Sequence, residues 1–160
     1  MIGGSLMADV EFEFLLNQIP FKGLMIEVGT YHGVTARKIC DRRPDVRVIS
    51  IDSFNTNDGC RGNIDYYEKN MCARQTLFIG TLQEYLKKNI AIASLIFIDA
   101  SHTMEDTLQD LESAMTLKDC IITGHDLLPG REVNDAVNKF CLMYGYKVIL
   151  CKSLYRLIKL

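Results

Sequence analysis

The chain has 160 residues, of which 48% are hydrophobic and 24% are charged, and its formal net charge is −2. This length suits one domain with a full core and is short for two, so we expect a single domain over residues 1–160. The small net charge gives no general attraction to nucleic acid or to acidic membranes. No hydrophobic run is long enough to cross a bilayer, residues 1–8 lack the pattern of a secretory signal, and the six cysteines show no zinc-ligand spacing. These features predict a cytoplasmic protein that binds neither nucleic acid nor membranes.

The first half of the chain alternates helix and strand patterns. Residues 9–19 fit either element, since Val10, Phe12 and Phe14 alternate like a strand while Asp9 suits a helix cap, and we favour the helix. The other predicted elements of this half are strands at 24–27, 46–51 and 76–79, helices at 32–43, 64–72 and from residue 82, and a loop at 55–63.

The second half continues the alternation and then changes at its end. Strands are predicted at 93–98 and 120–123, and each is followed by a helix with an apolar stripe. The runs at 146–151 and 154–160 are joined by only two residues, which leaves no room for a crossover helix, so these strands must pair antiparallel. The pattern predicts an α/β fold: a Rossmann-like three-layer α/β/α sandwich whose seven-stranded, mostly parallel sheet has an antiparallel C-terminal strand.

A glycine-containing loop follows the first predicted strand. Gly29 and Gly33 lack side chains that would keep the backbone away from a ligand, and the helix that begins there offers unpaired N–H groups. The spacing is Gly-x-x-x-Gly, which differs from the Gly-x-Gly-x-x-Gly fingerprint of dinucleotide sites. The loop therefore predicts a ligand that carries a nucleoside, without requiring a pyrophosphate.

Polar residues gather where the predicted parallel strands end, which is the edge at which open α/β sheets bind ligands. Asp52 closes the second strand about twenty residues after the glycine loop, a position from which a carboxylate binds ribose hydroxyls. A simple turn or helix cap is the alternative for Asp52, and the preceding glycine loop favours the ribose.

The fourth and fifth predicted strands end in carboxylates and imidazoles. Asp99 and Asp126, with His125, could hold a divalent metal, for which oxygen ligands favour Mg²⁺ or Ca²⁺ and an imidazole favours manganese, iron or zinc. His102 follows Asp99 and could accept a proton from a substrate hydroxyl. The alternatives are structural: Asp99 and Ser101 as helix caps, His125 as a hydrogen-bonded core residue and His102 as a surface residue.

These motifs resemble those of the class I S-adenosylmethionine-dependent methyltransferases. The resemblance rests on Glu27-Val-Gly-Thr-Tyr-His-Gly33 and on Asp52 after the second strand. Three further features narrow the resemblance to the metal-dependent O-methyltransferases: Phe97-Ile-Asp-Ala-Ser-His102, Asp110 in the next helix, and Gly124-His-Asp126. That group includes the catechol and caffeoyl-CoA enzymes, macrocin-type sugar O-methyltransferases and cephalosporin hydroxylase-like proteins, and its fold places the antiparallel seventh strand beside the fifth.

The resemblance implies a role for each matching residue. His102 would be the general base, and Asp99, His125 and Asp126 would hold Mg²⁺ or another divalent metal. One departure is the His125-Asp126 pair, since relatives usually have an acidic residue followed by Asp or Asn there. The residues expected to contact the cofactor S-adenosylmethionine are Glu27, Gly29, Thr30, Tyr31, Gly33, Asp52, Ser53, Gly80, Thr81 and Asp99.

The predicted activity is therefore metal-assisted methylation of a hydroxyl group on a small molecule, such as a sugar or a natural product. Relatives usually carry further N-terminal helices or an insertion over the acceptor, and here little chain precedes the first strand. Either a large acceptor covers itself or a second subunit of a homo-oligomer does so. Two alternatives are a module that binds S-adenosylmethionine without catalysis and a nicotinamide-dependent oxidoreductase, which the missing third glycine disfavours.

Overall fold

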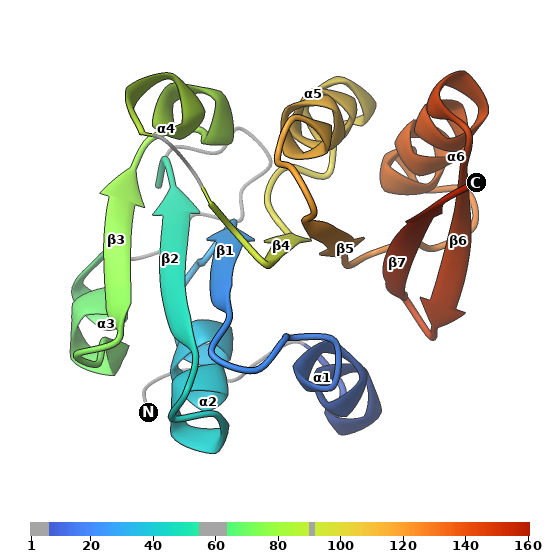
Figure 1. Cartoon of the computed structure of the whole chain (residues 1–160). Helices are drawn as coiled ribbons and strands as arrows, with labels where there is room; N and C mark the ends of the chain where they lie inside the picture. The colour runs from blue at the N-terminus through green and yellow to red at the C-terminus, as the bar shows by residue number, and fades with distance from the viewer. Residues whose placement is uncertain (1–6, 55–63, 90–91) are drawn as a thin grey trace.

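The structure is a computed structural model, and it describes residues 7–54, 64–89 and 92–160. Its middle layer is a single sheet in which β1 to β5 pair in parallel and β7 is antiparallel to both β5 and β6 (Figure 1). The strands, in the spatial order β3-β2-β1-β4-β5-β7-β6, are β1 (Leu24–Val28), β2 (Arg47–Asp52), β3 (Gln75–Ile79), β4 (Leu95–Ile98), β5 (Ile121–Gly124), β6 (Tyr146–Cys151) and β7 (Leu154–Lys159).

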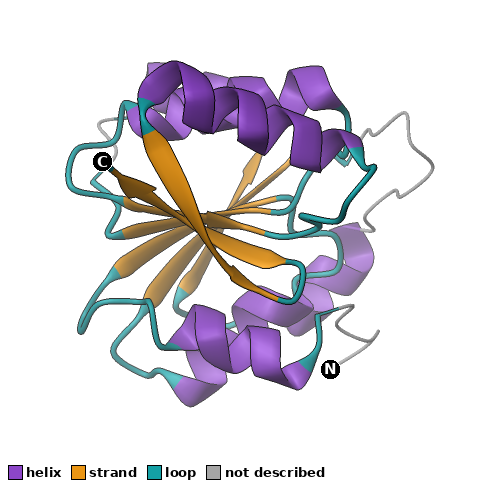
Figure 2. Cartoon of the chain, turned by 90° about the vertical axis from the view of Figure 1, so that its right-hand side faces the viewer, coloured by secondary structure: helices purple, strands orange, loops and turns teal. Residues whose placement is uncertain are grey.

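Helices cover both faces of this sheet (Figures 1 and 2). One face carries α1 (Asp9–Leu16), α2 (Val34–Arg42) and α3 (Ile64–Asn70), and the other carries α4 (Leu82–Lys88), α5 (Met104–Met115) and α6 (Glu132–Tyr144). Among the described residues no helix is long and apolar enough to cross a membrane.

The hydrophobic core lies in two layers, one on each side of the sheet. Leu111 and Phe140 belong to the layer under α5 and α6, while Leu15 and Ile39 belong to the layer under α1 and α2. All four residues of β4 are buried, which is the reason this strand reads as a continuous apolar run. The observed layers and strand order confirm the predicted Rossmann-like three-layer sandwich and its antiparallel strand beside the fifth.

Element boundaries differ from the prediction where local backbone geometry intervenes. The helix predicted from His32 begins at Val34, because Gly33 caps it in the left-handed conformation with a φ of 72°. The strand predicted from residue 93 begins at Leu95. Residues 55–63, predicted as a loop, lie outside the part of the chain that the structure describes.

The connectivity fixes the position of a cleft. The chain runs outward from β1 to β2 and β3, then returns so that β4 pairs with the other side of β1. This reversal of strand order between β1 and β4 is the switch point at which open α/β sheets bind ligands.

Candidate active site

The loops after β1, β2, β4 and β5 meet at the switch point. Backbone hydrogen bonds continue the sheet into them: the amide of Gly29 donates to Ile51, that of Asp99 to Val28 and that of His125 to Ile98. The loops therefore start from fixed positions, and the side chains that follow the strands converge at one edge of the sheet.

Other parts of the protein pack closely against the two glycines of the first loop. A side chain at Gly29, whose φ is 84°, would collide with the backbone carbonyl of Asp99, and one at Gly33 would lie 2.6 Å from the ring of Tyr67. The explanation given from the sequence, close approach of a ligand, is therefore incomplete, since packing and a positive φ already require glycine here.

Asp52 is the last residue of β2, and its carboxylate binds the glycine loop. The Thr30 and Tyr31 amides donate to Oδ2, both at 2.9 Å, and the Phe54 amide donates to Oδ1 at 2.7 Å. Tyr31 and Phe54 both have positive φ, 52° and 51°, a conformation that non-glycine residues adopt only when their surroundings hold it. Asp52 thus holds two neighbouring turns in their unusual conformations.

Glu27 lies inside the sheet and is only 1% exposed. Burial raises the pKa of this carboxyl to about 7, although the Ser50 hydroxyl, which donates to Oε2 at 2.9 Å, acts in the opposite direction. The negative charges of Asp99 and Asp52 raise the pKa further. A carboxyl group is therefore held close to its protonation midpoint at neutral pH.

A cavity of about 400 Å³ opens beside Asp52, between the ends of β2 and β4 and the helices α4 and α5. This volume falls within the range of ligand sites, about 300–1,000 Å³. Four of the residues predicted to contact the cofactor line it: Asp52, Ser53, Gly80 and Thr81. The other predicted cofactor residues lie outside its lining.

Two polar residues of this cavity were missed as candidate ligand contacts. Asp110 of α5 is 8% exposed, and its Oδ1 accepts a hydrogen bond of 2.9 Å from Nε2 of Gln83 on α4. Burial raises the pKa of Asp110 to about 6, the Gln83 hydrogen bond lowers it and the charge of Asp106 raises it. Asp110 entered the sequence argument only as part of a motif, and its burial toward the cavity follows from the packing of α4 against α5.

Three candidate metal ligands converge at the ends of β4 and β5. One donor atom each from Asp99, His125 and Asp126 lies within 4.8 Å of the others, with 3.9 Å from His125 Nδ1 to Asp99 Oδ1 and 3.2 Å to Asp126 Oδ1. Donor atoms that share one first-row ion are separated by similar distances, since each bond is about 2.0–2.2 Å long. The two carboxylates and one imidazole therefore fit a divalent cation, and the imidazole favours manganese, iron or zinc over magnesium.

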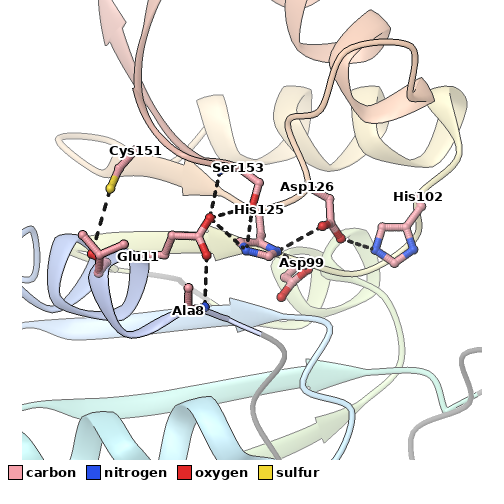
Figure 3. Close-up of polar contacts among 9 residues, drawn as sticks. Ala8, Glu11, Asp99, His102, His125, Asp126, Cys151 and Ser153 are labelled. Carbon is pink, nitrogen blue, oxygen red and sulfur yellow. Dashed lines mark hydrogen bonds and ion pairs between the residues drawn. The ribbon is translucent and has the colours of Figure 1, made fainter.

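Asp126 links this cluster to His102. Its second oxygen, Oδ2, lies 2.9 Å from His102 Nε2, and both side chains are partly exposed (Figure 3). The hydrogen bonds from His102 and His125 hold the pKa of Asp126 well below its usual range, whereas burial raises the pKa of Asp99 to about 6. Asp126 has a φ of 59°, so a strained backbone places this carboxylate between the two imidazoles.

The far side of His125 contacts residues from opposite ends of the chain (Figure 3). Its Nε2 lies 3.1 Å from Ser153 Oγ and 3.6 Å from Glu11 Oε1, and Glu11 also accepts hydrogen bonds from the Ser153 amide and hydroxyl. Burial alone would lower the pKa of His125, yet Asp126, Asp99 and Glu11 together raise it to about 9. Glu11 and Ser153 were missed from the sequence, because neither occupies a strand end of the parallel sheet.

A second cavity, of about 530 Å³, lies on the outer side of His102. Asp126, Leu128, Arg131 and Val133 also line it. The pair His102 and Asp126 thus borders a space large enough for a small molecule, and the imidazole faces the cluster on one side.

A family model described as a methyltransferase domain matches residues 26–127, a range that begins within β1, ends just after β5 and contains every predicted site residue. No protein of the curated set matches the chain.

Solved methyltransferases share the fold at low sequence identity. A precorrin-6y C5,15-methyltransferase from Geobacter metallireducens has a TM-score of 0.71 and 17% identity, with 99% of this chain and 92% of that chain covered. An O-methyltransferase from Bacillus cereus, in complex with S-adenosylhomocysteine (SAH), has a TM-score of 0.67 and 15% identity, with 98% and 83% covered. The O-methyltransferase TomG from Streptomyces achromogenes, in complex with S-adenosylmethionine, has a TM-score of 0.61 and 11% identity, with 92% and 76% covered.

Proposed function

Because the chain belongs to this methyltransferase family, whose model matches more than half of its residues, we propose that it methylates a hydroxyl group of a small molecule with S-adenosylmethionine as the donor. The observation that carries the proposal is the pair of His102 and Asp126, which borders a cavity at the carboxyl edge of the sheet. An imidazole whose second nitrogen faces a carboxylate is suited to accept a proton from a hydroxyl. The O-methyltransferases from B. cereus and S. achromogenes support the oxygen acceptor and the cofactor by analogy.

The cofactor supplies a methyl group on a positively charged sulfur. We assign its nucleoside to the 400 Å³ cavity, where Ser53 and Asp52 approach from β2 and the Gly80-Thr81 turn approaches from β3. Asp52 already accepts three backbone hydrogen bonds, so its proposed role includes shaping the glycine loop as well as binding ribose. The residues assigned to the methionine end are Glu27, Gly29, Thr30, Tyr31, Gly33 and Asp99.

His102 is the proposed general base. When Nε2 donates to Asp126, the nitrogen that accepts the proton is Nδ1. The negative charge of Asp126 then stabilises the imidazolium that forms. The acceptor oxygen bonds to the methyl carbon as the sulfur–carbon bond breaks, and the hydroxyl proton passes to His102, so that charge and atoms balance.

Asp99, His125 and Asp126 would hold the divalent metal. A cation bound there would lower the pKa of an acceptor hydroxyl and orient its oxygen. Asp99 and Asp126 would supply the anionic ligands, and His125, whose ring is fixed by Ser153 and Glu11, would supply the nitrogen after releasing the proton that its raised pKa otherwise retains. The loops after β4 and β5 would thereby orient the acceptor toward the methyl donor, and this positioning would contribute to the rate.

The proposal is tested in two stages with the full chain. Calorimetric titration with S-adenosylmethionine, SAH and NAD comes first, and we expect binding of the first two only. Transfer of a radiolabelled methyl group is then measured against a panel of catechols, sugars and phenolic natural products, with Mg²⁺, Mn²⁺ or no metal.

Formation of product that requires His102 would support the proposal that the protein is an enzyme. The control variant is Glu105→Gln, on the exposed start of α5. Binding of S-adenosylmethionine without product from any acceptor would favour a non-catalytic module. Binding of NAD alone would replace the proposal with an oxidoreductase.

A further inference from the structure

Two cysteines from separate segments of the chain meet beside α2. Cys40 lies in the last turn of α2 and is fully buried, whereas Cys72 follows α3 and is half-buried. Both thiols are free, and Cys72 packs against the core cluster that contains Cys40. An accessible sulfur therefore lies next to an inaccessible one.

Hydrogen bonds on both sides of Cys72 hold its segment against α2. Arg37, on α2, donates from Nη1 to the carbonyl of Asn70 at 3.5 Å. Arg74 donates from Nη2 to the carbonyl of Cys40, at the other end of the segment. Cys72 is thus held against the helix that carries Cys40, between two contacts that do not involve its own side chain.

The groups around the two sulfurs show that the thiols interact directly. Burial and the hydrogen bond with the Cys72 thiol raise the pKa of Cys40 to about 12, while the charge of Arg74 acts in the opposite direction. Arg37, whose pKa is raised chiefly by Asp41, also interacts with both thiols. Cations next to a thiol favour the thiolate form on which oxidation depends.

A half-buried thiol beside a fully buried one has the arrangement of a cysteine that meets an oxidant first and a second cysteine that resolves the product. We propose that a peroxide oxidises Cys40 and Cys72 to a disulfide, which joins α2 to the segment between α3 and β3. Neither sulfur belongs to the residues proposed for methyl transfer, so formation of the disulfide does not depend on that function.

The oxidation proceeds in two steps. The sulfur of Cys72 attacks one oxygen of hydrogen peroxide, the O–O bond breaks, and a sulfenic acid and water form. The sulfur of Cys40 then attacks the sulfur of Cys72, the S–O bond breaks, and the leaving hydroxide takes the thiol proton to form a second water. The two thiols together lose two electrons and two protons, which reduce the peroxide to water.

The disulfide would restrain the support of the glycine loop. Asn70 of α3 donates from Nδ2 to the carbonyl of His32 at 2.8 Å, and the ring of Tyr67, also on α3, packs against Gly33. A covalent bond at Cys72 would limit the movement of these contacts. It would also close a loop of chain that contains β2 and α3, which restricts the unfolded state and so stabilises the fold.

The first test locates the bond by mass spectrometry. Reduced full-length protein is treated with hydrogen peroxide, the remaining thiols are alkylated with iodoacetamide, and the protein is digested with trypsin without reductant. Cys40 and Cys72 lie on the separate tryptic peptides 39–42 and 70–74. We expect these two peptides to appear as one linked species that dithiothreitol separates. Recovery of both peptides in alkylated form, or a link from either to another cysteine, would overturn the proposal.

The second test assigns the order of the steps with variants. Cys72→Ala removes the accessible sulfur and should leave Cys40 unoxidised, whereas Cys40→Ala should leave Cys72 as a sulfenic acid that dimedone traps. Cys120→Ala, which removes a half-buried thiol next to β5, should form the same linked species as the wild type. Oxidation of Cys40 in Cys72→Ala would overturn the assigned order. If Cys40→Ala does not fold, Cys72→Ala and the wild-type digest still decide the proposal.

The third test measures the restraint by thermal melting. We expect the oxidised wild type to melt about 5–10 °C above the reduced wild type, and we expect no such gain in Cys72→Ala after the same treatment. A melting temperature that stays the same or falls when the disulfide forms would overturn the proposed restraint.

Discussion

The imidazole of His102 and the carboxylate of Asp126 lie within hydrogen-bond distance across the ends of β4 and β5, with 2.9 Å between Nε2 and Oδ2. The two residues come from different loops, and the pair borders a cavity of about 530 Å³. This geometry places an imidazole and a carboxylate next to a space large enough for a small molecule.

Replacing His102 separates catalysis from cofactor binding. We expect His102→Ala to lower the rate of labelled methyl transfer by about 10²- to 10⁴-fold, the usual contribution of a general base. The affinity for SAH, measured by calorimetry, should change less than about threefold because His102 does not line the 400 Å³ cavity to which we assign the nucleoside. Unchanged turnover would remove His102 from the mechanism.

Asp99 tests the metal site. Calorimetric titration of the wild-type protein with Mn²⁺ should show one site, and Asp99→Asn should weaken binding by at least about tenfold, because an anionic ligand is lost. The control is Asp135→Asn on the exposed part of α6, which should bind Mn²⁺ as the wild type does. Equal Mn²⁺ affinity in the wild type and Asp99→Asn would show that the cluster is not a metal centre.

Asp52 should contribute to stability as well as to ligand binding. Asp52→Ala leaves the amides of Thr30, Tyr31 and Phe54 without their acceptor, so we expect the free energy of unfolding to fall by about 2–4 kcal/mol. Asp52→Asn keeps one acceptor oxygen and should lose less. Urea denaturation measures both, and an Ala variant as stable as the wild type would contradict the proposed support of the glycine loop.

Gly29 and Gly130 form a matched pair. Both have positive φ, 84° and 74°, but a side chain at Gly29 would collide with the Asp99 backbone whereas one at Gly130 would meet nothing within 4 Å. We expect Gly130→Ala to cost about 1 kcal/mol from backbone strain alone, and Gly29→Ala to cost at least about 2 kcal/mol more from overpacking. Equal losses of stability in urea would show that the approach of the two loops is not tight.

The raised pKa of the buried Glu27 carboxyl should make the stability of the protein depend on pH. Its pKa is about 7 in the folded protein and 4.5 as the unperturbed value, so the folded state binds the extra proton between these limits. The stability that this proton provides is complete below pH 4.5 and is lost as pH rises through 7. Relative to wild type, Glu27→Gln should therefore gain about 3 kcal/mol in unfolding free energy between pH 4.5 and pH 8. Parallel stability curves for the two proteins in urea would refute the buried, protonated carboxyl.

The sequence predicted correctly which polar residues lie at the strand ends. Asp52 ends β2, Asp99 and His125 come directly after β4 and β5, and parallel strands place such residues at one edge of the sheet whatever the details of packing. The resemblance to class I methyltransferases added the antiparallel strand beside β5, which the structure confirms.

Contacts made between elements could not be predicted in the same way. Gln83 and Asp110 meet because α4 packs against α5, and their spacing in sequence carries no periodic signal. The reason for Gly29 was also incomplete, since the collision with Asp99 depends on how closely two loops approach. Pairings of this kind depend on side-chain packing rather than on local pattern.

The contact of Glu11 with Ser153 bears on the order in which the site forms. These residues are separated by 142 positions, and together they fix the ring of His125 from behind. Closing a contact over so long a stretch of chain is slow and brings its stabilisation only after most of the sheet exists. During synthesis, therefore, β1 to β5 and the residues that line the 400 Å³ cavity emerge before the β6–β7 turn can dock on α1. The ring of His125 acquires its fixed orientation only when the last strands have folded, so this orientation is reached at a late stage of folding.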